Sequence, residues 1–353
     1  MNNLSGTLTI SLSAIQENYK QLQSLCGSTC ETAAVVKANA YGLGVSKVTP
    51  ALYQAGARTY FVATLDEGIE IRELIKDAKI YTFNGFDSTQ APTYKKHKIA
   101  PILNSYEALR QYKDTGGGPA ILNCDTGMNR LGLTQAEVGR VIDDPSTLET
   151  IQLDYVMSHF SSSEEPDNRR NEQQFDRFKS LMPHFRDKKF SLCNSEGIFR
   201  SSNYHCDLTR PGIAIYGVGQ GMQPVVSLSA PVLQIHSVKQ GETAGYNETY
   251  TFQNDSNVAV IGAGYADGLP ISLSNRGAVY WQGYRLPICG RVSMDLIICD
   301  LKDVPENQYP KRGDQCEVIG QNQTTEMLSK DAGIIPYVIF TSLGKRYKRT
   351  YIS

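Results

Sequence analysis

The stretch AAVVKANAYGLG, from Ala33 to Gly44, joins a short apolar run to a lysine, Lys37. The run Ala33–Val36 is typical of a buried strand bounded by turn residues. An amine at the mouth of such a strand is poorly hydrated, which lowers its pKa and favours Schiff-base formation. The alternative interpretation of Lys37 is a surface lysine whose stem covers apolar neighbours.

Apolar runs of this kind recur between helical patterns. They are Ala33–Lys37, Thr59–Ala63, Lys79–Phe83, Ile99–Leu103, Pro119–Cys124, Leu153–His159, Lys189–Ser195 and Cys206–Arg210. Capping boxes at Thr64–Glu67 and Thr134–Glu137 open two of the helices, and Asn104–Glu107 is a weaker start signal. The alternation predicts an α/β fold with an N-terminal (β/α)8 TIM-like barrel. A doubly wound sheet would normally have a longer glycine-rich loop than Gly42–Gly44 after its first strand.

From about Pro224 onward the apolar runs become short and closely spaced. They are Val225–Ser229, Val232–Val238, Val258–Ile261, Ala278–Trp281, Leu296–Cys299 and Cys316–Ile319. This pattern predicts a C-terminal, mostly-β domain. We expect the barrel over residues 1–228 and the β domain over 229–353, with residues 1–10 able to pair with the C-terminal domain.

Several polar residues follow the predicted barrel strands. They are Lys37 after the first run, Arg130 after the fifth, His159 at the end of the sixth, Asn194 and Ser195 at the seventh, and Arg210 at the eighth. Such barrels carry their chemistry at the carboxyl ends of the strands, often with a phosphate after the last two. Gly212 would also let backbone N–H groups approach an anion. Individually, His159 is more often a structural residue and Ser195 a helix cap.

These stretches resemble the alanine racemase family, pyridoxal-phosphate (PLP) enzymes of fold type III. The lysine stretch is similar to the family signature VVKANAYGHG, with Leu43 where a histidine is common. Further matches are DTGMNRLG (125–132), MSHF (157–160), NS (194–195), RPGIAIYG (210–217), GYNETY (245–250), GYADG (264–268), GRVSMD (290–295) and IPY (335–337). Their order covers essentially the whole chain.

The resemblance implies that Lys37 holds PLP as an imine. The other cofactor contacts implied are Tyr41, Asn194, Ser195, Tyr337 and the backbone of Gly212 and Ile213 around the phosphate. Arg210 would face the pyridine nitrogen, with His159 supporting it. Because arginine does not give up its proton, that nitrogen would stay unprotonated, which weakens the ring as an electron sink.

The implied reaction interconverts L-alanine and D-alanine through an imine of the substrate with PLP. It needs an acid/base on each face of the Cα atom, and the matching residues are Lys37 and Tyr246. Arg130 and the backbone N–H of Met294 would hold the substrate carboxylate. Asp295 would orient that loop, and Tyr265 would line the entrance. Family members take these second-domain residues from the partner subunit, so a homodimer with shared active sites is implied.

Two positions depart from the family pattern. Asn123 stands where many members have a lysine that becomes carbamylated, and Ile271 stands where an arginine is common. Asn123 cannot carry the negative charge of a carbamate, so Arg130 would need another counter-charge. We expect chloride beside Asn123 and Arg130, with a nearby carboxylate or water as the alternative.

The composition favours a cytoplasmic protein. The formal net charge is −1, which gives no general basic face for nucleic acid, and no apolar run has membrane-spanning length. The N-terminus lacks the pattern of a secretory signal. Cys26 and Cys30 form a lone C-x3-C pair, so we expect no metal site.

Related functions remain open alternatives. A PLP-dependent decarboxylase of basic amino acids shares the barrel but places a carboxylate, not an arginine, at the pyridine nitrogen. A non-catalytic PLP-homeostasis protein resembles the barrel alone, without the β domain. The sequence leaves open whether serine or other small amino acids are also racemised, and whether the role is D-alanine supply for peptidoglycan or catabolism.

Overall fold

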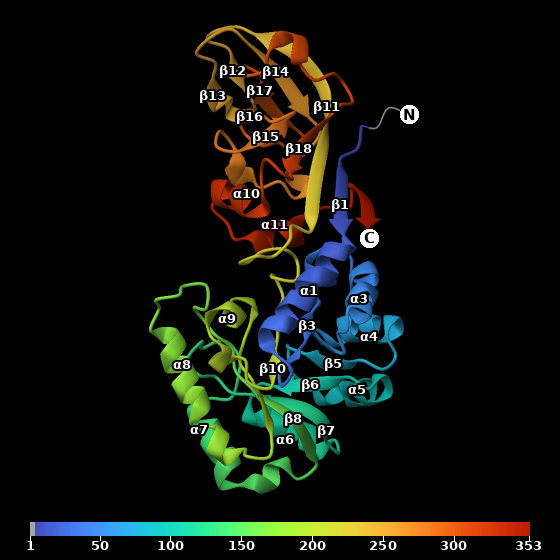
Figure 1. The fold of residues 1–353 in the computed structure, drawn as a ribbon, viewed down its shortest axis with the longest axis vertical. Helices are drawn as coiled ribbons and strands as arrows, with labels where there is room; N and C mark the ends of the chain where they lie inside the picture. Colours follow the sequence, from blue (N-terminus) through green and yellow to red (C-terminus); the bar gives the residue numbers. More distant parts are fainter. Residues whose placement is uncertain (1–3) are drawn as a thin grey trace. The chain divides into compact units, whose positions relative to one another are not determined.

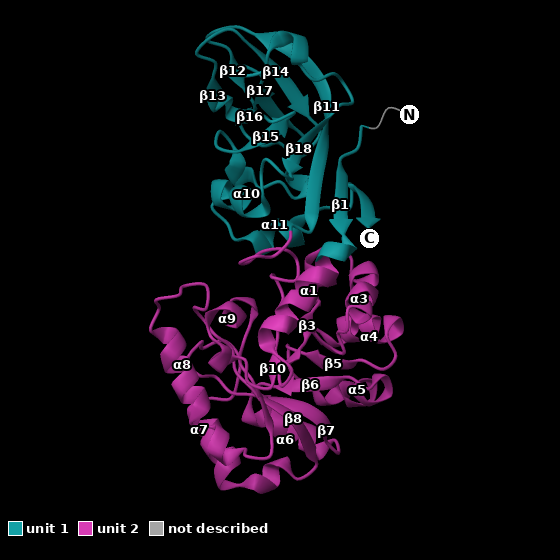
Figure 2. Cartoon of the chain, viewed as in Figure 1, with its two compact units in different colours: residues 1–14, 224–353 teal, residues 15–223 magenta. Residues whose placement is uncertain are grey.

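The computed structural model describes residues 4–353, which form two compact units (Figures 1 and 2). We call residues 15–223 the barrel unit, and residues 4–14 together with 224–353 the β unit. The division falls at 223/224, a few residues before the boundary expected from the sequence. It also falls within helix α1 (Leu12–Cys26).

The barrel unit is built on parallel strands in chain order. They are β3 (Ala34–Val35), β4 (Thr59–Val62), β5 (Lys79–Thr82), β6 (Ala100–Leu103), β7 (Gly118–Asn123), β8 (Ile151–Met157) and β9 (Lys189–Ser191). All residues of β4 and of β6 are buried, as expected where helices cover one face of a parallel sheet and the other face lines the barrel.

An eighth strand closes the circle. Strand β10 (Leu208–Thr209) pairs in parallel with β2 (Glu31–Thr32), which leads directly into β3. On the other side, the Arg210 N–H donates to the Cys193 carbonyl at 2.9 Å, which joins β10 to the segment after β9. The predicted eight-stranded TIM-like barrel is therefore confirmed.

Helices connect the strands on the outside of the barrel. They are α3 (Val45–Gln54), α4 (Leu65–Leu74), α5 (Ala91–His97), α6 (Tyr106–Asp114), α7 (Gln135–Asp143), α8 (Arg170–Lys179) and α9 (Ser195–Arg200). Both predicted capping boxes are present, at Thr64 and Thr134. The third helix start is capped by Ser105 instead of Asn104, since the Ser105 hydroxyl accepts from the Ala108 N–H at 3.1 Å.

The β unit is organised around a largely antiparallel sheet. Its strands run in the order β14 (Ser256–Ile261), β17 (Ile297–Asp300), β16 (Tyr284–Cys289), β15 (Ala278–Trp281), β18 (Gln315–Ile319), β11 (Val226–Val238), β1 (Thr7–Ser11) and β19 (Lys348–Ile352). Strand β1 pairs antiparallel with β11 and parallel with β19. Strand β14 also pairs with β11, and the short strands β12 (Thr243–Ala244) and β13 (Tyr250–Thr251) pair with each other in a second sheet.

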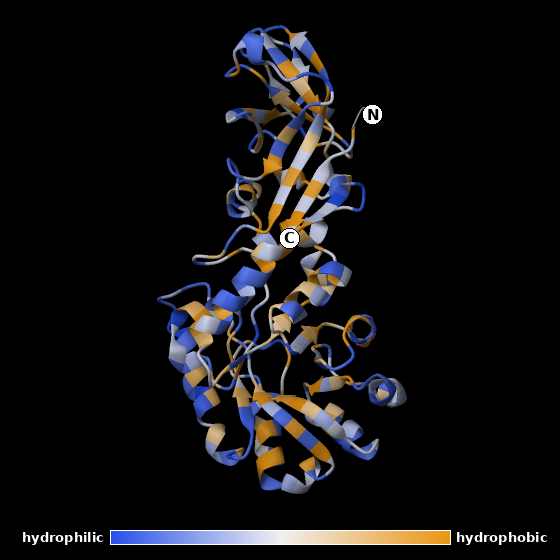
Figure 3. Ribbon diagram, turned by 45° about the vertical axis from the view of Figure 1, so that its right-hand side comes forward, coloured by the Kyte–Doolittle hydropathy of each residue, from blue (hydrophilic) through white to orange (hydrophobic). Residues whose placement is uncertain are grey.

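Strand β11 corrects one sequence prediction. Two runs separated near Pro231 were expected there, but β11 continues through Pro231 without interruption. Proline lacks an N–H, yet its carbonyl still accepts from the Gly262 N–H at 2.8 Å. The register also shifts on either side of this point, between Leu228 and Ser229 and between Val232 and Gln234. More and less hydrophobic residues alternate along its sequence, VSLSAPVLQIHSV, except at Val232–Leu233 and His236–Ser237. Figure 3 colours the chain by hydropathy.

Two helices, α10 (Thr325–Ala332) and α11 (Pro336–Ser342), complete the β unit. Across residues 4–353, no helix combines the length and apolar character needed to cross a membrane. The same residues contain no cluster of three or more His, Cys, Asp or Glu side chains suited to a metal ion.

Candidate active site

Lys37 begins an unusual turn at the end of the first barrel strand. Ala38, Asn39, Ala40 and Tyr41 all have φ between 53° and 55°, in the left-handed region. For a residue with a Cβ atom this conformation costs about 1–2 kcal/mol. The sequence of this turn contains no glycine before Gly42 to signal such a backbone.

Two side chains hold the turn in place, Glu67 from outside it and Asn39 from within it. The Glu67 carboxylate accepts from the Ala38 N–H at 2.7 Å with one oxygen and from the Ala63 N–H at 2.7 Å with the other. The Asn39 side chain accepts from the Val45 N–H at 2.8 Å. Glu67 was predicted only as part of a helix cap, and its second role in tying Ala38 to the end of β4 was missed.

The Lys37 amine lies half-buried at the carboxyl end of the strand, 5.3 Å from the centre of the Phe83 ring. Burial lowers the pKa of Lys37, and the nearby Arg130 guanidinium lowers it further, while Glu67 opposes both. The neutral amine that imine formation requires is therefore populated at a lower pH than for an exposed lysine.

Arg210 is 2% exposed and is held by a network of acceptors. Its Nη2 donates to the Ser158 carbonyl at 2.6 Å and to the Leu192 carbonyl at 3.2 Å, and its Nη1 donates to the Ser191 hydroxyl. The Nδ1 atom of His159 lies 3.4 Å from Nη2. Burial and the charge of Arg210 lower the pKa of His159 to about 3, so the ring is neutral and its Nδ1 can accept.

One donor of this buried guanidinium has no partner among residues 4–353. The Nε atom of Arg210 is fully buried and makes no hydrogen bond to any of these residues. A buried N–H without an acceptor is costly, so a ligand atom that accepts a hydrogen bond fits this position. An unprotonated pyridine nitrogen is such an acceptor, and the arrangement therefore fits PLP.

The expected phosphate contacts from the barrel unit also lie together. The Ser195 hydroxyl accepts from the Gly212 N–H at 2.9 Å and from the Ala214 N–H at 3.2 Å, which leaves its own hydrogen available to an anion. A Cβ atom on Gly212 would overlap the Tyr41 hydroxyl, so the glycine is needed for this close approach. Ile213 follows Gly212 and is buried.

Asn194 has a structural role in addition to the predicted one. Its side-chain oxygen accepts from the Gly197 N–H at 3.0 Å and from the Ser163 hydroxyl at 2.9 Å. Asn194 is thus the N-cap of α9, a role that the sequence had offered as the ordinary interpretation of its neighbour Ser195.

Asn123 and Arg130 lie at the end of β7 and in the loop that follows it. Asn123 is buried, and its amide donates to the Asn104 side-chain oxygen at 2.8 Å and to the Leu131 carbonyl at 3.2 Å. Arg130 is exposed. Both N–H bonds of the Asn123 amide are therefore engaged within the protein.

Within the β unit, the predicted site residues come from adjoining loops. The Tyr265 N–H donates to the Ser293 carbonyl at 3.0 Å, which places Tyr265 beside Met294. A Cβ atom on Gly245 would meet the Arg291 nitrogen at 2.9 Å, so the segment before Tyr246 runs against the same loop. The side chains of Tyr246, Tyr265 and Met294 are 71%, 42% and 52% exposed in the single chain.

The remaining predicted residues of the β unit have different environments. Asp295 forms an ion pair with Arg346 at 2.6 Å. Tyr337 lies half-buried in the first turn of α11. Ile271 is 47% exposed in a short 3-10 helix, Ile271–Leu273, and thus presents an apolar surface where an arginine is common in the family.

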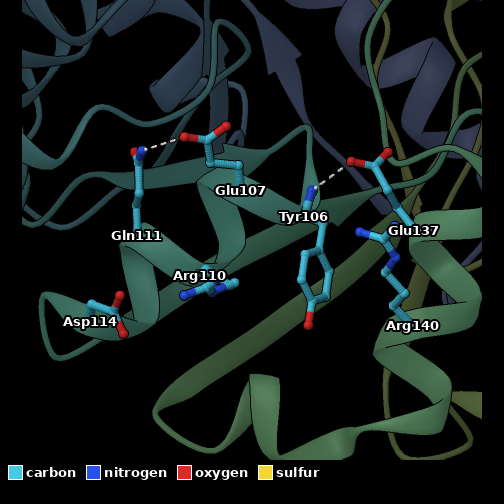
Figure 4. A pocket seen from close by; sticks show the side chains of 7 residues that line it. All are labelled: Tyr106, Glu107, Arg110, Gln111, Asp114, Glu137 and Arg140. Carbon is cyan, nitrogen blue, oxygen red and sulfur yellow. Dashed lines mark hydrogen bonds between the residues drawn. The ribbon is translucent and has the colours of Figure 1, made fainter.

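A separate pocket of about 480 Å³ lies between α6 and α7 (Figure 4). Its lining residues all belong to these helices and are Tyr106, Glu107, Arg110, Gln111, Asp114, Glu137 and Arg140. The Glu137 carboxylate accepts from the Tyr106 N–H at 3.1 Å, and the Arg140 guanidinium lies over the Tyr106 ring. None of the predicted site residues lines this pocket.

Comparisons with known proteins agree with the two-unit architecture. The model of the alanine racemase N-terminal domain matches residues 10–220, and that of the C-terminal domain matches residues 225–351. An alanine racemase from Acidiphilium cryptum is 42% identical, over 97% of this chain and 98% of the relative. A catabolic alanine racemase from Agrobacterium fabrum is 41% identical, over 99% and 92% of the two chains.

Solved structures give the same result. The alanine racemase from Bartonella henselae, which has covalently bound pyridoxal phosphate, superimposes with a TM-score of 0.93 at 41% identity, covering 99% of both chains. The biosynthetic alanine racemase from Pseudomonas aeruginosa also reaches a TM-score of 0.93, at 29% identity and the same coverage. The resemblance found in the sequence is confirmed: this chain belongs to the alanine racemase family.

Proposed function

We propose that this protein is a PLP-dependent alanine racemase that interconverts L-alanine and D-alanine. The unpaired Nε of the buried Arg210 carries this proposal, because it presents a permanent donor where the cofactor ring nitrogen would lie. A basic-amino-acid decarboxylase would have a carboxylate there. The covalently bound cofactor of the Bartonella henselae relative further supports PLP.

Lys37 would hold the cofactor covalently, and Tyr41, Ser195 and the Gly212–Ile213 backbone would hold its phosphate. Supporting contacts from Asn194 and Tyr337 belong to the same proposal. His159, neutral and in contact with Arg210, would keep the guanidinium in its orientation without adding a second charge. PLP joined to the substrate amine would withdraw electrons from the Cα–H bond and so acidify that proton.

Proton movement requires one group on each face of the substrate Cα atom. Lys37 would remove or return the proton on one face, and its lowered pKa favours the neutral, basic form. Tyr246 would act on the opposite face. For one enantiomer Lys37 would remove the proton and Tyr246 would supply one; for the other enantiomer the two roles would be exchanged. The pair therefore accounts for racemisation in both directions.

The substrate carboxylate would bind between Arg130 and the backbone N–H of Met294. Arg130 would supply a charge that also lowers the pKa of Lys37, so it would serve both recognition and the population of the neutral amine. Tyr265 would line the approach to this position, with Asp295 holding the Met294 loop. Ile271 would make this approach less polar than in relatives that have arginine there.

We further propose a homodimer in which each site combines the barrel unit of one subunit with Tyr246, Tyr265 and Met294 of the other. The high exposure of these three side chains in a single chain supports their covering by a partner. Cytoplasmic D-alanine supply for peptidoglycan is the role we infer, with a catabolic role as the alternative, since relatives of both kinds are similar to this chain.

We also propose a chloride beside Arg130, although fewer protein N–H groups are available to bind it than the sequence led us to expect. The Asn123 amide already donates both of its hydrogens within the protein, so a chloride would contact Arg130 and not this amide. Activity should then depend on chloride beyond ionic strength, while bicarbonate should have no effect. Equal KM values in chloride and in a bulky anion at matched ionic strength would exclude the ion.

The cofactor assignment is tested by reduction with borohydride followed by peptide mapping. The pyridoxyl group should be found on Lys37, and Lys37→Ala should lose both the label and the formation of D-alanine from L-alanine. Lys47→Ala, which removes an exposed lysine from α3, is the matched control and should retain both. A label on any other lysine would refute the assignment.

A further inference from the structure

Three segments of the β unit meet at one point. The Ala266 N–H donates to the Met294 carbonyl at 3.0 Å, which joins segment 264–268 to segment 293–295. The Gly344 N–H donates to the Asp267 carbonyl at 2.9 Å, which joins segment 264–268 to segment 342–346. The first two segments carry Tyr265 and Met294, so their relative position decides how these two residues face a substrate.

The backbone of segment 264–268 leaves no room for side chains at two positions. A Cβ atom on Gly264 would overlap the Met294 carbonyl, and one on Gly268 would overlap the Ser342 carbonyl. Gly268 also has a φ of 98°, which residues with a Cβ atom rarely adopt. The three segments are therefore in direct backbone contact.

Arg346 joins these segments with its whole guanidinium group. Nε and Nη2 contact the two carboxylate oxygens of Asp267 at 2.7 and 2.8 Å, and Nη1 contacts the Asp295 carboxylate at 2.6 Å. Nη2 also lies 3.5 Å from the Met294 carbonyl. The Arg346 side chain thus contacts segment 264–268 and segment 293–295 at the same time.

The charges explain why this position needs arginine. Asp267 is 6% exposed, and its carboxylate also accepts from the Gly264 N–H at 3.0 Å. A buried carboxylate requires a counter-charge, and the planar fork of arginine reaches both of its oxygens while a third N–H reaches Asp295. Lysine has one ammonium group and cannot bridge the two carboxylates in this way. The hydrogen bonds to Asp267 and Asp295 raise the pKa of Arg346 above its ordinary value.

We propose that Arg346 is a positioning residue that fixes the Met294 N–H and Tyr265 relative to each other for binding of the substrate carboxylate. This inference rests on the proposed racemase function, in which Met294 receives that carboxylate. Arg346 belongs to a basic cluster, Lys345–Arg349, whose composition is typical of a solvated strand face. In the structure Arg346 precedes β19, and its guanidinium contacts segments 264–268 and 293–295.

The kinetic test compares Arg346→Met and Arg346→Lys with Lys345→Met. Lys345→Met removes an equal charge from the adjacent exposed position and is the control. Arg346→Met should raise the KM for alanine and weaken inhibition by propionate, a carboxylate without an amine, by about 10- to 100-fold. Arg346→Lys should show an intermediate loss, while Lys345→Met should match the unaltered enzyme. All variants should retain the absorbance of the bound cofactor.

Amide hydrogen exchange on the holoenzyme reports on the loops without relying on activity. In Arg346→Met, exchange should be faster in peptides containing Tyr265–Asp267 and Ser293–Asp295, and unchanged in the strands of the barrel unit. Adding Asp267→Asn to Arg346→Met should increase the KM little further, since both changes remove the same ion pair.

Unchanged exchange in these loops, or faster exchange with an unchanged KM and unchanged propionate inhibition, would overturn the inference. A similar loss in Lys345→Met would do so as well, because it would indicate an effect of net charge. Failure of the proposed function shows separately, as absence of D-alanine formation by the unaltered chain. In that case, the comparison of amide hydrogen exchange between Arg346→Met and the unaltered chain would by itself show whether Arg346 holds segments 264–268 and 293–295 together.

Discussion

The Nη2 atom of Arg210 lies 3.4 Å from Nδ1 of His159, and this contact fixes which of the two groups donates. Arginine only donates, so Nδ1 must accept, and the low pKa of His159 keeps it able to do so. The guanidinium is thereby anchored through Nη1 and Nη2 while Nε remains for a ligand.

This arrangement predicts that Arg210 controls which reaction occurs. Arg210→Glu would let the cofactor ring nitrogen keep a proton, which strengthens the electron sink. Racemisation should slow, and pyruvate should appear from alanine by transamination, measured with a coupled dehydrogenase assay. Ser191→Ala removes a partner of Nη1 but keeps the arginine, so it should yield no pyruvate. A folded Arg210→Glu enzyme without pyruvate would contradict this role.

A second prediction concerns the left-handed turn after Lys37. Glu67→Gln replaces a carboxylate that accepts from Ala38 and Ala63 with a group that has only one accepting oxygen. The cofactor-free protein should lose about 0.5–1.5 kcal/mol of stability because one backbone N–H exchanges its protein acceptor for water. Urea unfolding measures this loss, and Glu70→Gln, exposed on the same helix, is the control. Equal losses in the two variants would indicate that the tether to Ala38 contributes nothing.

The environment of Lys37 predicts the pH dependence of cofactor attachment. The neutral amine reacts, so the rate of attachment to the cofactor-free protein should rise with pH through a midpoint below the ordinary lysine value of 10.5. Arg130 lowers the pKa of Lys37 and Glu67 raises it. Arg130→Met should therefore move the midpoint up, and Glu67→Gln should move it down. Absorbance of the attached cofactor measures both, and shifts in the same direction would refute the electrostatic account.

The shared site predicts complementation between two inactive variants. Lys37→Ala and Tyr246→Phe should each lose racemase activity, by about 10²–10⁴-fold for removal of the Tyr246 acid/base. After subunit exchange, mixed dimers would contain one site with both groups intact, so activity should return. No recovery once exchange is verified by mass spectrometry of tagged subunits would contradict a site built from two chains.

Much of the barrel unit could be predicted because its signals are local. Buried parallel strands give continuous apolar runs, and the capping boxes at Thr64 and Thr134 mark helix starts with their own side chains. The polar residues at the strand ends follow from the same alternation. The amino-acid sequence alone therefore sufficed to predict that Lys37, His159, Ser195 and Arg210 lie at one end of the barrel.

Other features depend on partners far away in the sequence. The left-handed turn at Ala38–Tyr41 is held by Glu67, and no residue within the turn announces it. A proline normally interrupts a strand, but the Pro231 carbonyl still accepts a hydrogen bond. The register of the strand shifts at residues near Pro231. Arg346 belongs to a basic cluster whose composition indicates solvent exposure, and only the buried carboxylate of Asp267 shows its role.

The central claim is most directly tested by incubating the PLP-loaded protein with L-alanine in deuterated water. Chiral chromatography with mass spectrometry should show D-alanine accumulating toward an equal amount of L-alanine, with one deuterium at Cα in each molecule of D-alanine formed. Tyr246→Phe should form this product about 10²–10⁴-fold more slowly while retaining the cofactor absorbance. Absence of D-alanine from the unaltered protein, or release of carbon dioxide from lysine or ornithine in its place, would contradict the racemase assignment.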